Sequence, residues 1–183
     1  TTTKVVATSA FHGSDNLFTV EIPNNLTNIR AYAFTEMSGL QYMNIPDEVV
    51  QISNRAFAQD YNLYSINFND TSKLPRISYE AFAYTGIYSF RVPANVSTIA
   101  QNAFIGNRNL TQVTFAANSK LESISAYMFD GSENLVSITF ESGSALTSIQ
   151  AHGLEGLSKL KTVDFGDAKL TNIDNYAFRF NTS

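Results

Sequence analysis

An internal repeat is the feature that most constrains how this chain can fold. A phenylalanine, usually preceded by alanine, returns every 22 to 25 residues along the 183-residue sequence. A fixed period of this length is typical of a solenoid, in which small units stack and share one continuous core. The period is marked by Phe11, Phe34, Phe57, Phe82, Phe104, Phe129, Leu154 and Phe178.

Each repeat carries the same apolar skeleton around this position. A β-branched residue stands five positions before it and, in all but the first copy, a Leu or Val stands three positions earlier still. A run after the phenylalanine begins with Leu or Ile and then alternates, as Val113 and Phe115 do on either side of Thr114. This alternation predicts a short, half-buried strand in every repeat.

The period predicts one strand per repeat, because it leaves too little chain for a hairpin and a crossover helix. Strands of successive repeats must then lie parallel to one another. We expect residues 1–183 to form a single domain, with a partial repeat over 1–16 and full repeats that begin near residues 17, 40, 63, 87, 110, 135 and 160. Neither end of the sequence resembles a polar capping repeat, so we interpret the chain as a segment of a longer array.

The repeated pattern resembles the BspA-like class of leucine-rich repeats over essentially the whole chain. A well-matched stretch runs from Val92-Pro93 through Ile99 to Ala103-Phe104-Ile105-Gly106. The resemblance implies an α/β repeat fold, a right-handed solenoid with short helical or 3-10 turns on its convex side. It also implies a secreted or surface-exposed protein of bacteria or protists that adheres to host or matrix proteins. It brings no catalytic or ligand-binding residue with it.

One departure from the family pattern concerns the glycine expected two positions after the phenylalanine. Four repeats carry another residue in this place, so the sequence does not predict the backbone conformation of these four turns. The glycine is kept at Gly106, Gly131 and Gly156, and is replaced at Glu36, Gln59, Tyr84 and Phe180.

Composition and motifs exclude several classes of function. The formal net charge is −4, so an electropositive surface for nucleic acid is not expected. No apolar run reaches the roughly 18 residues of a membrane span. Cysteine is absent, and His12 and His152 stand six repeats apart, too far to share a metal or a proton, so we interpret both as solvated. Asp164 and Asp167 could hold calcium through oxygen atoms, although a solvated turn is the simpler interpretation. We therefore expect no catalytic residue, cofactor or metal.

The outward face of the predicted strands is the candidate binding surface. Residues between the buried ones face outward because side chains alternate along a strand. Aromatic residues gather there in the first four repeats, with an arginine among uncharged polar residues, a composition that suits a protein contact. The predicted partner-binding residues are Phe18, Glu21, Tyr42, Asn44, Tyr64, Asn67, Tyr88, Arg91 and Gln112. The alternative is a sheet face that is merely solvated.

Taken together, these features favour a non-enzymatic module that recognises a host matrix or cell-surface protein, located at the cell surface or outside the cell. The alternative is a structural spacer that projects another domain from the surface. An enzyme would need carboxylates that converge on a cleft, and the acidic residues are scattered along the repeats instead.

Overall fold

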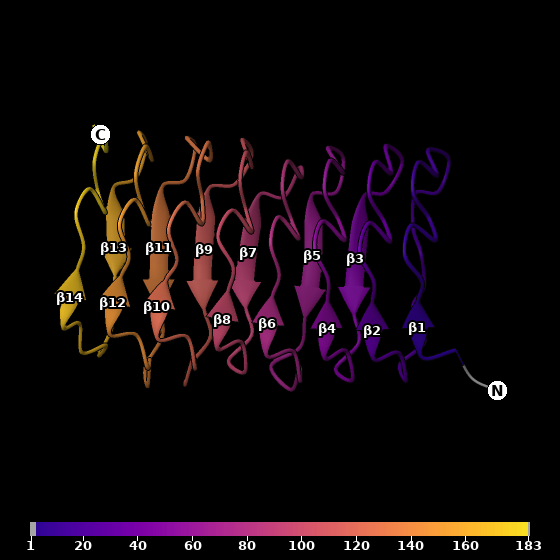
Figure 1. Cartoon of the computed structure of the whole chain (residues 1–183), viewed down its shortest axis with the longest axis horizontal. Helices are drawn as coiled ribbons and strands as arrows, with labels where there is room; N and C mark the ends of the chain where they lie inside the picture. Colours follow the sequence, from indigo (N-terminus) through magenta and orange to yellow (C-terminus); the bar gives the residue numbers. More distant parts are fainter. Residues whose placement is uncertain (1–2, 183) are drawn as a thin grey trace.

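The computed structural model describes residues 3–182, which wind into a solenoid of stacked coils. Figure 1 shows the strands in two rows that run the length of the molecule, with the arrows of one row opposite to those of the other. The two ends of the chain lie at opposite ends of the stack. Within each row, strand pairs are parallel. The predicted parallel stacking is therefore confirmed.

The longer strands form the row that the alternating runs predicted. Paired strands are in register, so that Val113 stands opposite Ile138, and buried residues alternate with more exposed ones. The pairing is interrupted between residues 65–68 and 89–92, so the row consists of two sheets. An isolated bridge from Thr19 to Tyr42 extends the row by one coil. The strands are β3 (Tyr42–Ile45), β5 (Ser65–Phe68), β7 (Ser89–Val92), β9 (Gln112–Phe115), β11 (Ser137–Phe140) and β13 (Thr162–Asp164).

The second row shows that the prediction of one strand per repeat is wrong. It consists of two-residue strands. The second residue of each strand is the β-branched residue five positions before the phenylalanine or its counterpart, which is Val6 in the first copy and isoleucine in the others. A coil that closes on itself needs no hairpin, so two residues on its second side suffice to pair with the neighbouring coils. These strands are β1 (Val5–Val6), β2 (Asn28–Ile29), β4 (Gln51–Ile52), β6 (Arg76–Ile77), β8 (Thr98–Ile99), β10 (Ser123–Ile124), β12 (Ser148–Ile149) and β14 (Asn172–Ile173).

The expected helical or 3-10 turns, and with them the α/β class, are also wrong, since residues 3–182 contain no helix. The reason lies in the backbone on either side of the phenylalanine. Around Phe34, the residues two before and two after, Tyr32 and Glu36, have φ angles of 58° and 60°. A left-handed residue at every fourth position ends a right-handed helix. Gly106 and Tyr84 share this conformation, with φ of 71° and 56°, so the turn is the same with or without glycine.

These turns are hydrogen-bonded to the next coil although they form no strand. The N–H of Phe34 donates to the carbonyl of Ala56 at 2.8 Å, and the N–H of Phe57 donates to the carbonyl of Ala81 at 2.9 Å. All three sides of a coil are thus tied to its neighbour through the backbone. This satisfies peptide groups that would otherwise be buried without partners.

The core is a set of columns in which equivalent side chains lie on top of one another. The phenylalanine rings stack face to face, with centroids 5.0 Å apart from Phe34 to Phe57 and 5.5 Å apart from Phe104 to Phe129. The same columns open at the outer coils, where Phe178 is 36% exposed. The burial predicted for every repeat is confirmed for the inner coils and is incomplete at the outer ones.

The position three residues after the phenylalanine forms a column that holds neighbouring coils together through the polar residues in it, whereas Met37 and Leu157 fill the same place with apolar side chains. Asn107 accepts a hydrogen bond from the N–H of Thr85 at 2.7 Å and donates one to the carbonyl of Phe82 at 2.9 Å. Asn181 makes the equivalent two bonds to the coil before it, at 2.9 and 3.0 Å. An amide suits this place because it both accepts and donates.

Asp60 occupies the same column and is fully buried. Its Oδ1 accepts from the N–H of Met37 at 2.8 Å, whereas its buried Oδ2, which corresponds to the amide nitrogen of the asparagines, has no partner. Burial raises the pKa of Asp60 to about 8, and although the N–H of Met37 opposes this shift, the nearby charge of Glu36 adds to it. The Asp60 carboxyl is therefore neutral at pH 7, with a proton where the asparagines carry theirs.

Removing one ring from the middle of the phenylalanine column should destabilise the fold more than removing one from its end. Phe104 is fully buried and contacts the rings of Phe82, Phe90 and Phe129. We expect Phe104→Ala to lower the free energy of unfolding by about 3–5 kcal/mol. Phe178→Ala should cost clearly less, because its ring already touches water. Urea denaturation of both variants checks this, and equal losses would contradict a shared core.

Stability should depend on pH through Asp60. The unfolded chain releases this proton near pH 4 and the folded chain near pH 8, so the stabilisation is complete below about pH 4 and is lost as pH rises to about 8. The amide of Asp60→Asn can donate a hydrogen bond from the same place but does not titrate. We expect the free energy of unfolding of Asp60→Asn, relative to that of the natural chain, to rise by up to about 1.4 kcal/mol per pH unit between about pH 4 and pH 8. Urea denaturation of both chains at several pH values measures the difference, in which all other titrating groups cancel. A difference that is constant with pH would refute the neutral carboxyl.

Candidate functional site

The nine residues predicted to bind a partner are all exposed. They lie on the outer face of the longer-strand row, from the first coil to β9. In β3, for example, Met43 and Ile45 point into the core and Tyr42 and Asn44 point outward. The alternation of the sequence therefore predicted the exposure of strand residues such as Tyr42 and Asn44, whereas Tyr64 and Tyr88 stand one residue before their strands and were predicted only to lie beside this face.

Four aromatic side chains give this face its character. Phe18, Tyr42 and Tyr88 are 60%, 47% and 55% exposed, and Tyr64 is 39% exposed. The rings of Tyr64 and Tyr88 stack across adjacent coils with centroids 6.2 Å apart. We call Phe18, Tyr42, Tyr64 and Tyr88 the aromatic stripe. Large aromatic side chains of this kind are enriched at protein interfaces.

The polar residues beside the aromatic stripe are held in fixed positions. Asn67 donates to the side-chain oxygen of Asn44 at 3.0 Å across two coils. Arg91 forms a two-pronged ion pair with Glu141, with one of its bonds at 3.1 Å, and lies 3.4 Å from Asp70. Glu141 raises the pKa of Arg91 more than Asp70 does, and Arg91 in turn lowers the pKa of Glu141. Arg91 is thus already paired and is not a free donor to a partner.

The structure brings five of the nine predicted residues together, and it does so in two shallow hollows rather than in one. A hollow of about 390 Å³ is lined by Glu21, Tyr42 and Asn44, among others. A second one of about 220 Å³ is lined by Arg91, Gln112 and Glu141, among others. Glu141 was not predicted, because it follows β11, fifty residues after Arg91, and nothing in the repeat pattern links the two.

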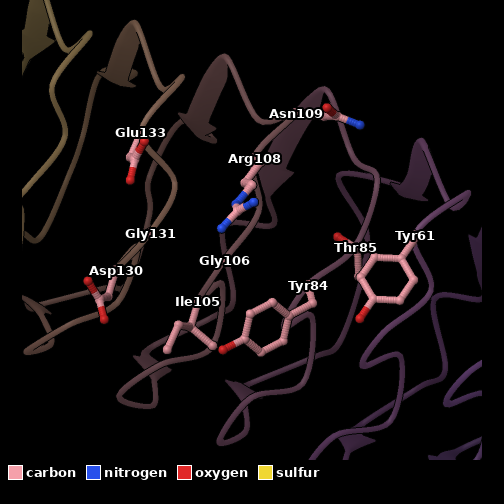
Figure 2. A pocket seen from close by; sticks show the side chains of 10 residues that line it. All are labelled: Tyr61, Tyr84, Thr85, Ile105, Gly106, Arg108, Asn109, Asp130, Gly131 and Glu133. Carbon is pink, nitrogen blue, oxygen red and sulfur yellow. The ribbon is translucent and has the colours of Figure 1, made fainter.

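A larger groove of about 610 Å³ lies at the edge of the coils, and none of its lining residues was predicted as a site. Figure 2 shows Tyr61 and Tyr84 on one side of it, Asp130 and Glu133 on the other, and the guanidinium of Arg108 between them. We call this the turn-edge groove.

A sequence irregularity coincides with the turn-edge groove. The aliphatic residue that leads the strand stands six positions after the phenylalanine or its counterpart in the other repeats, but Ile87 stands only five positions after Phe82. Gly86 lies so close to the coil before it that a Cβ there would be 2.2 Å from the carbonyl oxygen of Tyr61, and Gly39 makes the same approach to Asp15 in a loop of ordinary length. The shortened loop supplies Tyr84 and Thr85 to the groove, between the loops that supply Tyr61 and Arg108. The 22-residue gap is the sequence signal that marks this loop.

The remaining candidates for chemistry are structural. His12 is exposed as expected, but His152 is not simply solvated, since its ring stacks 4.9 Å from that of Tyr127 and bonds to Glu155. Asp167 accepts two hydrogen bonds from the N–H of Gly143, the main reason that its pKa is lowered. Over the described part of the chain, no group of three His, Cys, Asp or Glu residues could hold a metal. Within the same residues, no helix is long and apolar enough to cross a membrane.

Two rows of parallel strands around columns of aliphatic and phenylalanine side chains define a leucine-rich-repeat solenoid. The BspA type leucine rich repeat region, in six copies, matches residues 1–111 and 98–183. The chain therefore belongs to the BspA-type leucine-rich repeat family, as the resemblance of its sequence implied.

Solved structures of bacterial leucine-rich repeat proteins share the fold. A T. pallidum protein has a TM-score of 0.76 and 24% identity, with 86% of this chain and 71% of that one covered. A leucine-rich repeat protein of Eubacterium ventriosum has a TM-score of 0.64 and 17% identity, with 80% of this chain and 45% of that chain covered. A leucine rich cell surface protein of Faecalibacterium prausnitzii has a TM-score of 0.54 and 20% identity, with 98% of this chain and 62% of that chain covered. This chain thus spans less than half of the Eubacterium protein. No curated protein matches the sequence.

The contact between Gly106 and the ring of Tyr84 in the turn-edge groove can be tested by substitution. Gly106 and Gly156 have φ angles of 71° and 73°, so Ala at either place should cost about 1–2 kcal/mol of stability through the left-handed backbone. A Cβ on Gly106 would also lie 2.3 Å from the ring of Tyr84, whereas one on Gly156 meets nothing within 4 Å. We expect Gly106→Ala to be the more destabilising in thermal denaturation. Adding Tyr84→Ala should make the two losses equal, and a persistent difference would contradict the contact.

Proposed function

We propose that this chain is a non-enzymatic recognition module that binds a protein partner through the aromatic stripe. The observation that carries the proposal is the exposure of four large aromatic side chains along one face of the longer-strand row. Such side chains contribute much contact area for little lost conformational freedom. Because the backbone beneath them is held on all sides of the coil, the surface is pre-organised, which lowers the entropic cost of binding.

The polar surroundings favour a partner whose contact surface is largely uncharged. Asn44, Asn67 and Gln112 offer amide groups beside the stripe, and Arg91 is neutralised by Glu141. The net charge of −4 is small for 183 residues, so long-range steering of a strongly charged partner is not required. Amide and aromatic groups together suit the exposed backbone and apolar side chains of a protein partner.

The family membership supports a location outside the cell. Leucine-rich repeats of this family are recognition surfaces, and one protein of the same fold is described as a leucine rich cell surface protein. We propose that residues 1–183 act as one domain at the cell surface or after secretion, and that the partner is a host matrix or cell-surface protein.

A structural spacer is the second candidate, and the later coils favour it. Their outward strand residues are small and polar, as at Ser137, Thr139 and Thr162. A surface of this kind offers no aromatic anchor. A spacer would use the stacked coils only for length and stiffness, and would retain no partner.

Truncation of the aromatic stripe tests the recognition role. We expect Tyr42→Ala combined with Tyr88→Ala to weaken binding to immobilised matrix proteins or whole cells by about tenfold or more, the size of a lost aromatic anchor. The melting temperature should stay nearly unchanged, because both rings are about half exposed. Tyr176→Ala is the matched control, since Tyr176 is 57% exposed but lies away from the stripe. Surface plasmon resonance measures all three chains.

Two outcomes would contradict this role. If the natural chain retains no matrix protein or cell, the spacer is favoured. If the double variant binds as tightly as the natural chain, the stripe is not the binding face.

A further inference from the structure

The turn-edge groove shares none of its lining residues with the aromatic stripe, although the two surfaces adjoin where Tyr88 and Arg108 line a common hollow. The aromatic wall of the groove is unusually accessible, with Tyr61 and Tyr84 exposed by 62% and 42%. Gly106 and Gly131 stand at the position where Tyr84 carries a ring one coil earlier. The Tyr84 ring lies over Gly106, where a Cβ would be only 2.3 Å from it, whereas no side chain lies within 4 Å of a Cβ placed on Gly131. The groove therefore has apolar faces at one end and open backbone at Gly131.

The charged groups of the groove are available to a ligand. Arg108, Asp130 and Glu133 are all exposed, and none of them takes part in an ion pair among residues 3–182. Figure 2 shows the guanidinium of Arg108 between the tyrosine wall and the two carboxylates. A ligand that lies along the groove meets rings, then hydrogen-bond donors, then acceptors.

This order of groups disfavours most classes of ligand. A cation attracted to Asp130 and Glu133 would have Arg108 between it and the tyrosine rings that could also hold it. An anion drawn to Arg108 would be repelled by the two carboxylates. A purely apolar ligand would leave three charged groups without hydrogen-bond partners, which is costly once water is displaced.

We propose that the turn-edge groove binds a short, neutral oligosaccharide. Sugar rings present C–H faces that pack on the Tyr61 and Tyr84 rings, and hydroxyls that both accept from Arg108 and donate to Asp130 and Glu133. The volume of about 610 Å³ lies within the range of small-molecule sites. The groove includes Tyr84 and Thr85 of the loop before Ile87, which is one residue shorter than the corresponding loop of the other repeats.

An NMR titration of the isotope-labelled full chain tests the proposal. The probes are maltohexaose, cellohexaose, mannohexaose and chitohexaose, with a heparin hexasaccharide and oligolysine as charged comparisons. At least one neutral sugar should shift the amide signals of Gly106 and Gly131, which line the groove. The signals of Gly13 and Gly166, which lie outside the groove, should stay in place.

Variants tie the signal to the groove. Tyr61→Ala and Tyr84→Ala should each weaken the retained sugar about tenfold, as for a truncated aromatic anchor, without lowering the melting temperature. Asp130→Asn combined with Glu133→Gln should keep sugar binding, since amides still accept hydrogen bonds, but would abolish binding of a cation. Tyr42→Ala, in the aromatic stripe, should have no effect on the sugar.

Three results would overturn the proposal. The first is that no neutral sugar shifts the groove glycines. The second is that only oligolysine or the heparin fragment does so, which would make the ligand a charged one. The third is sugar binding that survives both tyrosine variants. None of these results bears on the aromatic stripe, so the two surfaces are judged separately.

Discussion

The structure depends on the stacking of each phenylalanine on the equivalent ring of the next coil. A single coil has no interior of its own, because its apolar side chains all point toward one axis and are covered only from above and below. The ring of Phe82 is buried because Phe57 and Phe104 lie on either side, at 5.5 and 5.6 Å. The same requirement explains why Phe178, in the last coil, remains partly in water. Stability in such an array is a property of neighbours rather than of single repeats.

The tight turns around the phenylalanine are the second constraint. Two left-handed residues per coil bend the chain sharply enough to return it in so short a period, and they exclude a helix. Glycine meets this demand without strain at Gly131, but Tyr84 and Gln59 adopt the same angles because the hydrogen bonds to the adjacent coil hold them there. Tertiary pairing thus fixes a backbone that local preference would not choose.

The two candidate surfaces arise in different ways from this regular frame. The aromatic stripe uses the regularity, since equivalent strand positions in adjacent coils place Tyr64 and Tyr88 against one another. The turn-edge groove lies at a departure from it, since Tyr84 and Thr85 of its lining belong to a loop that is one residue shorter than its counterparts. A repetitive fold allows both, because a surface can form either from equivalent positions in successive coils or from a local difference between neighbouring coils. The carboxyl of Asp60 is such a difference inside the core, where it takes the place of an amide.

The sequence by itself determined the period, the apolar columns, the parallel strands and the outward face that carries Tyr42. These follow from local spacing, because side chains alternate along a strand and every repeat must hide the same stripe. Only the tertiary structure decided that a second row of two-residue strands exists, since two residues carry no period of their own. It alone paired Arg91 with Glu141 across fifty residues and gathered Tyr84, Arg108 and Asp130 around one groove. Such contacts depend on how coils lie against one another, which the spacing within a coil does not encode.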